Sequence, residues 1–484
     1  MEDSLFAQVM LGLSFPVIIA SFFVFRPQVA LVIAAFGGEM FLPEGPGFKF
    51  PFLPPFDKHN LPYMAALIGC FLRSPNMFLR LPRERWFQVM VLLVVVGGVL
   101  SGLTNPDPVP MVRVPPLPAM TLKDGFFLSF HNATRMIFPF LLGLAIYRKP
   151  SDLRALLIAF SVAGMIYLPF ILWEIRMSPN LHRLLYGYFQ GDDFSQTRRW
   201  GGYRPVVFMS HGLALARFMV CATMAPFVFG NTARGFLGVP WRIAKWILFV
   251  VLILCKSTGA IVYIIVVLPL LIRRRAKRMV QVSVVLAAVV FLYPVLRFTG
   301  VFPVQGILDT SASLLNADRS ASMAFRFKNE DSMLERARER PLFGWGSYGR
   351  NFTYDENGDM SIPDGYWILI LGMLGIAGYT AAFALLLVPI IIARRRLKSI
   401  PSEQDRRLVA GFCLILAIVA VDLIPNGLWG LYQYMLAGAL TGTLRGLRQE
   451  ALKQQAAAAA GAQSWGSELE TRGTARAATS GTAN

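Results

Sequence analysis

The feature of this chain that most limits its fold is a series of apolar runs, because about 20 apolar residues suffice to cross the hydrocarbon core of a bilayer. Hydrophobic residues make up 55% of the 484, and only 15% are charged. The long runs lie at about 5–25, 86–103, 124–146, 155–175, 206–229, 279–296, 364–393, 408–425 and 427–444, and shorter or interrupted runs at about 28–42, 61–72, 243–256 and 258–272. The sequence therefore predicts an all-α, polytopic integral membrane protein with about 11 to 13 transmembrane helices.

The basic residues predict the orientation of these helices. The net charge is +19, but Lys and Arg are dispersed over short connections instead of forming one basic arm, which argues against a nucleic-acid partner. They cluster at 73–85, 148–154, 234–245, 273–278, 394–407 and 445–448. Cytoplasmic connections are enriched in Lys and Arg, so we expect these clusters in the cytoplasm, the N-terminus outside and the C-terminus inside.

The connections on the opposite side include one that is far longer than a turn. They lie at roughly 43–60, 104–121, 176–204 and 297–363. In the last, the segment 325–340 predicts an amphipathic helix that lies against the membrane domain with Met333, Leu334 and Ala337 and ends before Pro341. We therefore divide the chain into a transmembrane domain, 1–453, which includes the 297–363 loop, and a disordered cytoplasmic tail, 454–484, whose composition cannot bury a core.

An arginine within an apolar run is the clearest sign of function or of a buried ion pair, because ionisable groups are expensive in a membrane. Arg217 lies in the middle of 208–218. Two interpretations are open: a buried ion pair, with Glu174 or Asp422 as partner, or contact with a substrate.

Other arginines flank the apolar runs. Arg199 and Arg204 precede the run that contains Arg217, and Arg326 begins the predicted helix of the long loop. Guanidinium groups are always charged and match phosphate oxygens in pairs. We therefore expect two arginine groups, distant in sequence, to converge on one anionic group such as a lipid-linked pyrophosphate.

No metal site or nucleotide site is predicted. Gly344 to Gly349 fits the spacing Gly-x-Gly-x-x-Gly, but no strand precedes it. The four cysteines and the four histidines show no metal-ligand spacing. We expect no metal and no cofactor.

The second half of the chain contains an ordered series of motifs. They are Arg326 and a polar helix, then Arg340-Pro341-Leu342-Phe343-Gly344-Trp345-Gly346, then Asp364-Gly365-Tyr366-Trp367. Upstream lie Arg204-Pro205-Val206-Val207-Phe208 with His211-Gly212, and Ser257-Thr258-Gly259-Ala260. In this order the motifs resemble the O-antigen ligase and polymerase superfamily of bacterial membrane glycosyltransferases. The Arg204 segment is similar to the arginine motif that precedes a span in that family, and the Ser257 segment is similar to its Ser-Arg-Gly-Ala element.

The resemblance implies transfer of a glycan from a polyprenyl pyrophosphate carrier at the periplasmic face of the bacterial inner membrane, without metal. The implied partners are the carrier-linked glycan, membrane lipid and polysaccharide assembly proteins. We expect Arg326 and Asp364 to be catalytic. The residues expected to bind substrate are Arg199, Arg204, His211, Arg217 and Arg340.

One departure from the family pattern bears on the type of enzyme. Ligases of this family carry a His followed by a small polar residue where the loop meets the span, whereas this chain has Asp364-Gly365. A carboxylate can still accept the proton of an acceptor hydroxyl, or Asp364 can simply cap the following helix. The substitution favours a polymerase-like enzyme of O-antigen, capsule or exopolysaccharide synthesis over an O-antigen ligase that acts on lipid A core.

A transporter or flippase of a lipid-linked or anionic substrate is the competing class. Arg217, Lys256 and Asp422 would then line a path, and the interrupted helices at 243–272 fit that interpretation. Transporters of this kind often contain repeated halves, which this sequence lacks, and the long loop with its arginines favours an enzyme.

Overall fold

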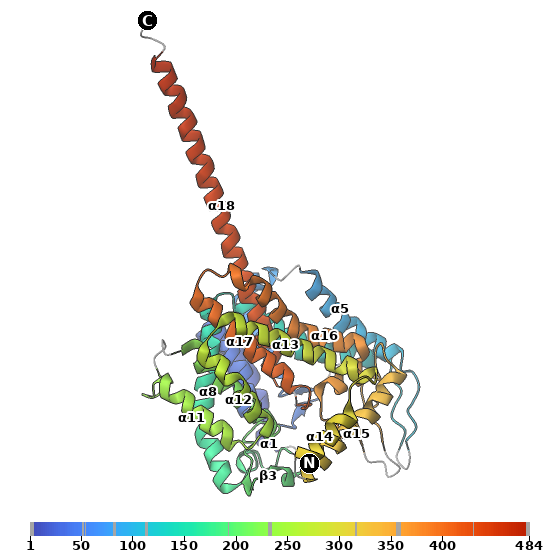
Figure 1. Ribbon diagram of the computed structural model, residues 1–484. Coiled ribbons are helices and arrows are strands. Elements are labelled where there is room, and N and C mark those ends of the chain that lie inside the picture. Colours follow the sequence, from blue (N-terminus) through green and yellow to red (C-terminus); the bar gives the residue numbers. More distant parts are fainter. Residues whose placement is uncertain are drawn as a thin grey trace.

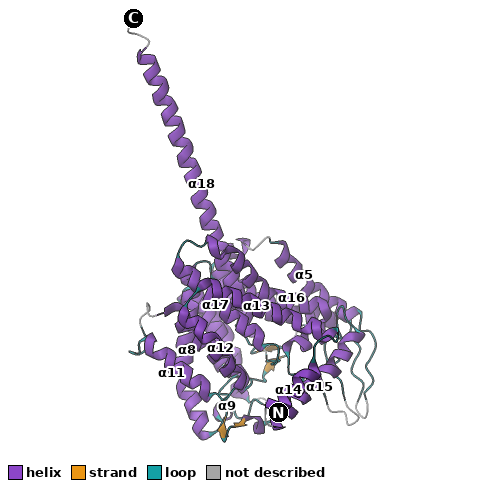
Figure 2. Cartoon of the chain, in the orientation of Figure 1, coloured by secondary structure: helices purple, strands orange, loops and turns teal. Residues whose placement is uncertain are grey.

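The computed structural model describes residues 4–50, 53, 55–80, 84–111, 115–191, 193–230, 235–314, 317–354, 360–428 and 430–480. Within these residues the chain is a bundle of helices (Figures 1 and 2). Its strands form two short antiparallel pairs, β1 (Gly47–Phe48) with β2 (Phe56–Asp57), and β3 (Arg198–Arg199) with β4 (Gly202–Tyr203). The prediction of an all-α fold is confirmed.

The predicted apolar runs all overlap helices of the bundle. These helices are α1 (Leu5–Val24), α2 (Pro27–Val32) with the π-helical η1 (Ile33–Gly37) and α3 (Gly38–Phe41), α4 (Leu61–Arg73), α5 (Arg85–Leu103), α6 (Leu122–Asn132) with the π-helical η3 (Ala133–Ile137) and α7 (Phe138–Ile146), α8 (Pro150–Met177), α10 (Gly212–Phe229), α11 (Trp241–Leu254), α12 (Thr258–Arg273), α13 (Ala276–Phe298), α16 (Tyr366–Arg396), α17 (Glu403–Asp422) and α18 (Gln433–Ser480). The connections contain η2 (Pro75–Arg80), α9 (Leu181–Tyr186), η4 (Phe194–Thr197), α14 (Val304–Leu314), α15 (Ala317–Glu339) and η6 (Leu397–Ser399).

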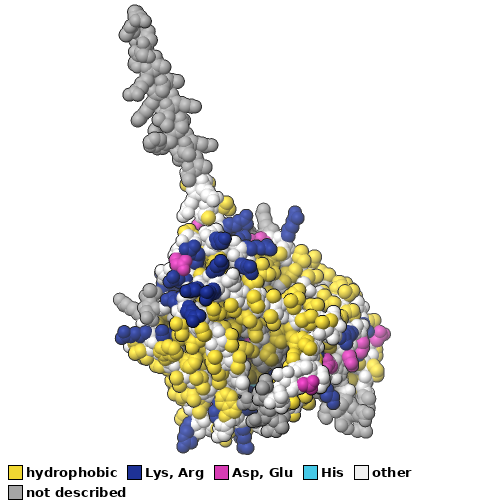
Figure 3. Space-filling view, viewed as in Figure 1, with side chains coloured by type: hydrophobic (Ala, Val, Ile, Leu, Met, Phe, Trp, Pro, Cys, Tyr) yellow, Lys and Arg dark blue, Asp and Glu magenta, His cyan; other side chains and the backbone are white. Residues whose placement is uncertain are grey.

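The surface of the bundle is that of a membrane protein. Six described helices, α1, α5, α8, α10, α13 and α16 extended through η6, are long and apolar enough to cross a membrane. Figure 3 shows a broad hydrophobic surface between the two ends of the bundle. On α13 the exposed Val285, Val289 and Leu292 follow helical spacing and form one apolar face. The chain is therefore a polytopic membrane protein, and the number of its spans stays a prediction.

Helix α10 lies at the centre of the bundle. All of its residues except Leu213 are buried, and it packs against α8, α11, α12 and α17. The segment that carries Arg204 and His211 leads directly into this helix. Those two residues therefore lie next to the start of a helix that is almost entirely buried.

Helix α16 is interrupted at Gly375, and the segment 341–346 fills the interruption. Gly375 has a left-handed backbone (φ 64°). Four backbone hydrogen bonds join the two segments, from the N–H groups of Trp345, Gly346, Ile376 and Ala377 to the carbonyls of Gly372, Met373, Pro341 and Leu342. A Cβ atom at Gly375 would lie 2.4 Å from the backbone of Leu342, and one at Gly344 would lie 2.5 Å from that of Met373. The loop segment thus satisfies backbone groups that the break would leave unpaired.

The helix predicted at 325–340 in the long loop is present as α15, but it begins earlier, at Ala317, so Arg326 lies within the helix and not at its start. The side chains of Met333, Leu334 and Ala337 are each 1% exposed. The helix ends at Glu339, before Pro341, as expected from the missing N–H of proline. It packs against α16 and α14, so the loop rests on the membrane domain.

The chain differs from prediction at its C-terminal end. We expected a disordered tail over 454–484, whereas α18 continues to Ser480 and projects from the bundle (Figure 1). Alanine has the highest intrinsic helix propensity, so this Ala-rich composition favours a helix even where it cannot bury a core. Residues 481–484 lie outside the described residues.

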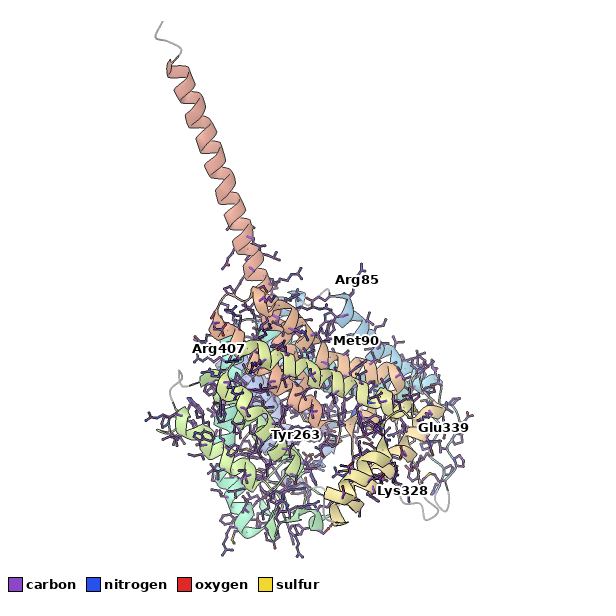
Figure 4. All side chains as sticks on the ribbon, in the orientation of Figure 1. Arg85, Met90, Tyr263, Lys328, Glu339 and Arg407 are labelled. Carbon is purple, nitrogen blue, oxygen red and sulfur yellow. The ribbon has the colours of Figure 1, made fainter. Side chains whose placement is uncertain are left out.

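Lys and Arg side chains gather at the end of the bundle from which α18 projects (Figure 3). Arg85 and Arg407 lie at that end, and Lys328 on α15 lies toward the opposite end (Figure 4). Residues 81–83 and 234, which belong to the predicted basic clusters, lie outside the described residues. We call the end with Arg85 and Arg407 the basic end of the bundle.

Candidate functional site

The hairpin of β3 and β4 holds two of the predicted arginines beside the turn between α11 and α12. Arg204 is only 7% exposed, and its Nη2 donates to the carbonyl of Lys256 at 3.2 Å. Its Nε has no hydrogen-bond partner among the described residues. In return, Nζ of Lys256 donates to the carbonyl of Arg199 at 3.1 Å. Arg204 is therefore a buried cation with donor capacity left over.

Positive charges from distant segments surround Arg204. Its pKa is lowered to about 10, by burial first and then by repulsion from Arg199 and Arg326. Arg326 comes from α15, more than a hundred residues further along the chain, and lies close enough to act on Arg204. The first turn of α12 follows Lys256 and adds the partial positive charge of a helix N-terminus. Such a group of cations favours a multiply charged anion.

Asp364 is the carboxylate beside this group. Its Oδ2 lies 3.6 Å from Nε of Arg326, and the two side chains are 23% and 43% exposed. Asp364 precedes the span of α16, which begins at Tyr366. Burial raises the pKa of Asp364, and the charge of Arg326 opposes that rise. The N-cap residue of α16 is Gly365, and no side chain caps this helix. The carboxylate of Asp364 pairs with Arg326 and does not serve as the helix cap.

His211 lies at the start of α10, one residue before the span. Its Nδ1 accepts a hydrogen bond from the N–H of Leu213 at 3.1 Å. Burial, followed by the charges of Arg204 and Arg199, lowers the pKa of His211 to about 4. The ring is therefore neutral near pH 7, and because Nδ1 accepts, the proton sits on Nε2. His211 can donate a hydrogen bond from Nε2.

Arg217 is held inside the bundle by its own partners. It is 3% exposed, and its Nη1 lies 3.6 Å from Oδ2 of Asp422. Its Nε donates to Oη of Tyr432 at 3.2 Å, and its Nη1 donates to the carbonyl of Leu428 at 2.9 Å. Of the two partners that the sequence suggested, Asp422 is the one present.

Glu174, the other suggested partner, fixes the backbone between Arg204 and His211. Its Oε2 accepts hydrogen bonds from the N–H groups of Val206 and Val207 at 2.7 and 2.8 Å. Val207 has a left-handed backbone (φ 59°), which is strained for a β-branched residue. A buried carboxylate thus holds the segment in a shape that it would not adopt alone.

Lys58 supports the same segment, and sequence reasoning missed it. Its buried Nζ donates to the carbonyl of Phe208 at 2.7 Å and forms an ion pair with Glu44 at 2.9 Å. The pKa of Glu44 is lowered, because the attraction of Lys58 and His59 outweighs its burial. The only signal in the sequence was a charged pair in the Pro-rich connection 43–60, which is too common to indicate a contact.

Arg340 belongs to a different group of residues. Its guanidinium Cζ lies 4.5 Å from the ring centroid of Trp345, and that of Arg336 lies 3.3 Å from the same ring. Arg340 also donates to the carbonyl of Thr104.

A third arginine, Arg350, supports the same region. It is fully buried and donates to carbonyls of the 104–121 connection. These arginines anchor the 341–346 segment, and the structure does not bring Arg340 to Arg326.

The structure thus brings Arg199, Arg204, His211, Arg326 and Asp364 together and leaves Arg217 and Arg340 apart. With the membrane-spanning bundle, these residues define the class of protein: a multi-pass membrane protein with a cationic site and a neighbouring carboxylate.

A comparison with protein families finds a similarity over part of the chain. Residues 243–383 match the family model described as O-antigen ligase. This match supports the resemblance to the O-antigen ligase and polymerase superfamily that the sequence motifs indicated, and it suggests a glycosyl-transferring enzyme of that type. The matched segment contains Lys256, Arg326 and Asp364 and ends within α16. Comparison with curated proteins gives no match.

Proposed function

We propose that the protein transfers or polymerises a glycan from a polyprenyl pyrophosphate carrier at the periplasmic face of the bacterial inner membrane. The observation that carries this proposal is the position of Arg326, which lies within electrostatic reach of the buried Arg204 and forms an ion pair with Asp364. The arginines supply sites for a diphosphate, and the carboxylate supplies a base next to them. We favour a polymerase-like reaction in O-antigen, capsule or exopolysaccharide synthesis.

The proposed reaction is a single displacement. The oxygen of an acceptor sugar hydroxyl forms a bond to the anomeric carbon of the carrier-linked glycan. The bond from that carbon to the pyrophosphate oxygen breaks, and its electron pair stays on the pyrophosphate. Asp364 takes the hydroxyl proton, and one displacement inverts the configuration at the anomeric carbon.

Arginines stabilise the charge that grows on the leaving group. Arg204 and Arg326 would contact the pyrophosphate oxygens, and the exposed Arg199 would approach from the hairpin. Preorganised cations in a partly buried site are effective because they need little reorganisation during the reaction. Nε2 of His211 is placed to donate to another oxygen of the substrate.

Arg326 has a second role in this proposal, because it links binding of the donor's diphosphate to the basicity of Asp364. Burial raises the pKa of Asp364, and the charge of Arg326 opposes that rise. A bound diphosphate would attract Arg326 and weaken that influence. The pKa of Asp364 would then rise further, and the carboxylate would become a stronger base only when the donor is present.

The charge distribution supports the proposed side of the membrane. The basic end of the bundle carries the Lys and Arg clusters, and α15 lies toward the other end (Figures 3 and 4). Under the rule that positive charge marks cytoplasmic connections, the site faces the periplasm.

The experiment is to incubate the purified protein in lipid nanodiscs with carrier-linked oligosaccharide and to follow product length by gel electrophoresis. A polymerase lengthens the glycan on the carrier. An O-antigen ligase, the alternative within the superfamily, needs added lipid A core and transfers the glycan to it. Absence of any glycosyl product with both acceptors, together with movement of the carrier-linked glycan across the bilayer, would instead identify the transporter or flippase class.

A further inference from the structure

A basic cavity lies at the end of the bundle opposite the candidate site. It has a volume of about 490 Å³ and is formed by the start of α13, the end of α16 with η6, and the start of α17. Its cationic lining residues are Arg275, Lys277, Arg394, Lys398 and Arg406. In Figure 3 the Lys and Arg side chains of the bundle gather at this end.

The positive charge of this cavity is mostly uncompensated. Its one lining carboxylate, Glu403, already forms salt bridges with Arg406 and Arg407, each at 3.0 Å. Among the described residues, none of the other four cationic side chains has a carboxylate within salt-bridge distance. Four cations held near one another without partners repel, so an anion that binds between them is stabilised.

The backbone adds to this charge. Helix α13 begins at Ala276, which lines the cavity, and no side chain caps its first turn. The free N–H groups and the dipole of a helix N-terminus favour an anion, particularly a phosphate. The side chains and the helix therefore select the same kind of ligand.

The lining also contains apolar residues, next to the polar Gln281. Ala276, Val280 and Leu397 are the apolar lining residues. On the same helix, Val285 and Val289 are exposed and continue toward the middle of the bundle. A ligand in this cavity therefore meets cations at the membrane boundary and hydrocarbon-compatible surface next to them.

From this combination we infer that the cavity binds the headgroup of an anionic phospholipid of the leaflet at the basic end. The phosphate would lie among Arg275, Lys277, Arg394 and Lys398, and the acyl chains would run along the apolar face of α13. Basic pockets between transmembrane helices recognise such headgroups through charge. This site is separate from the proposed glycosyl transfer and does not depend on it.

The test measures thermal unfolding of the delipidated full chain in detergent, with cardiolipin, phosphatidylcholine or inorganic phosphate added. A ligand that binds only the folded protein raises its melting temperature. We expect cardiolipin to raise it and the other two to have little effect. The rise should be lost in R275Q/K277Q and in R394Q/K398Q. It should persist in R273Q/R278Q, which removes two exposed charges next to the cavity that do not line it.

Three results would overturn the inference: an equal shift with phosphatidylcholine, the same shift with inorganic phosphate alone, or an equal loss in the control variant. The first would show binding without headgroup selection, the second a site for a free ion, and the third a response to overall charge. A second measurement needs no variant. A photoactivatable anionic phospholipid should label peptides that contain 275–281 or 394–406 of the native chain, and labelling confined to other segments would contradict the site.

Discussion

Asp364 Oδ2 lies 3.6 Å from Nε of Arg326 and thereby joins the start of α16 to the middle of α15. Arg326 belongs to the 297–363 connection, and Asp364 lies where that connection meets the next apolar run. The pair leaves Asp364 partly buried beside a cation that a diphosphate would also attract. This relationship yields the first two predictions.

Arg326→Ala should lower the rate of glycan elongation by about 10²-fold or more, the usual loss when one preorganised charge-stabilising group is removed. The rate is measured with purified protein and carrier-linked oligosaccharide. Lys328→Ala is the matched control, since Lys328 is exposed on the same helix and should leave the rate unchanged. Equal rates for R326A and the native protein would remove Arg326 from the reaction.

The rate should depend on pH through Asp364. The base must be ionised, so the rate falls as pH decreases through the pKa of Asp364, which burial raises above its ordinary value. Because Arg326 opposes that rise, the midpoint for the residual activity of Arg326→Gln should lie at higher pH than in the native protein. A pH–rate profile of both proteins checks this. A profile that Asp364→Asn leaves unaltered in shape and height would contradict the assignment.

Arg217 should be needed for stability. Arg217→Met leaves Asp422 buried without its ion-pair partner, and breaking such a pair typically costs about 3–5 kcal/mol. The double variant R217M/D422L removes both charges and should recover part of the lost melting temperature, as measured by thermal unfolding in detergent. Full stability of the single variant would show that the ion pair contributes little and would return Arg217 to consideration as a substrate contact.

Gly375→Ala should destabilise the protein. The left-handed backbone alone costs on the order of 1–3 kcal/mol for other residues, and the added Cβ would overlap the backbone of Leu342. Gly97→Ala is the control, because a Cβ there meets nothing within 4 Å and alanine favours the helix. Thermal unfolding of both variants measures the difference, and similar melting temperatures would argue against close contact between the two segments.

The sequence was most informative where burial follows a helical period. Met333, Leu334 and Ala337 were expected on the inner face of a loop helix, and all are buried. Asp422 was one of two partners suggested for Arg217, since membrane interiors force such charges to pair. The all-α class and the superfamily likewise followed from apolar runs and ordered motifs.

Tertiary contacts were beyond sequence reasoning. The break at Gly375 exists because 341–346 supplies hydrogen bonds from another part of the chain, and glycine alone gives no such signal within an apolar helix. The separation of Arg340 from Arg326 has the same origin, since Trp345 and Thr104 hold Arg340. Helix formation in the Ala-rich tail followed local propensity where composition had suggested disorder.

The insertion of 341–346 into α16 has a consequence for biosynthesis. These residues leave the ribosome before α16, so on the proposed topology the two halves of that helix close around a segment that has already been exported. Assembly of α16 on that topology therefore depends on prior export of the loop, and a chain that stalls in export would leave the backbone groups on both sides of Gly375 without their hydrogen-bond partners.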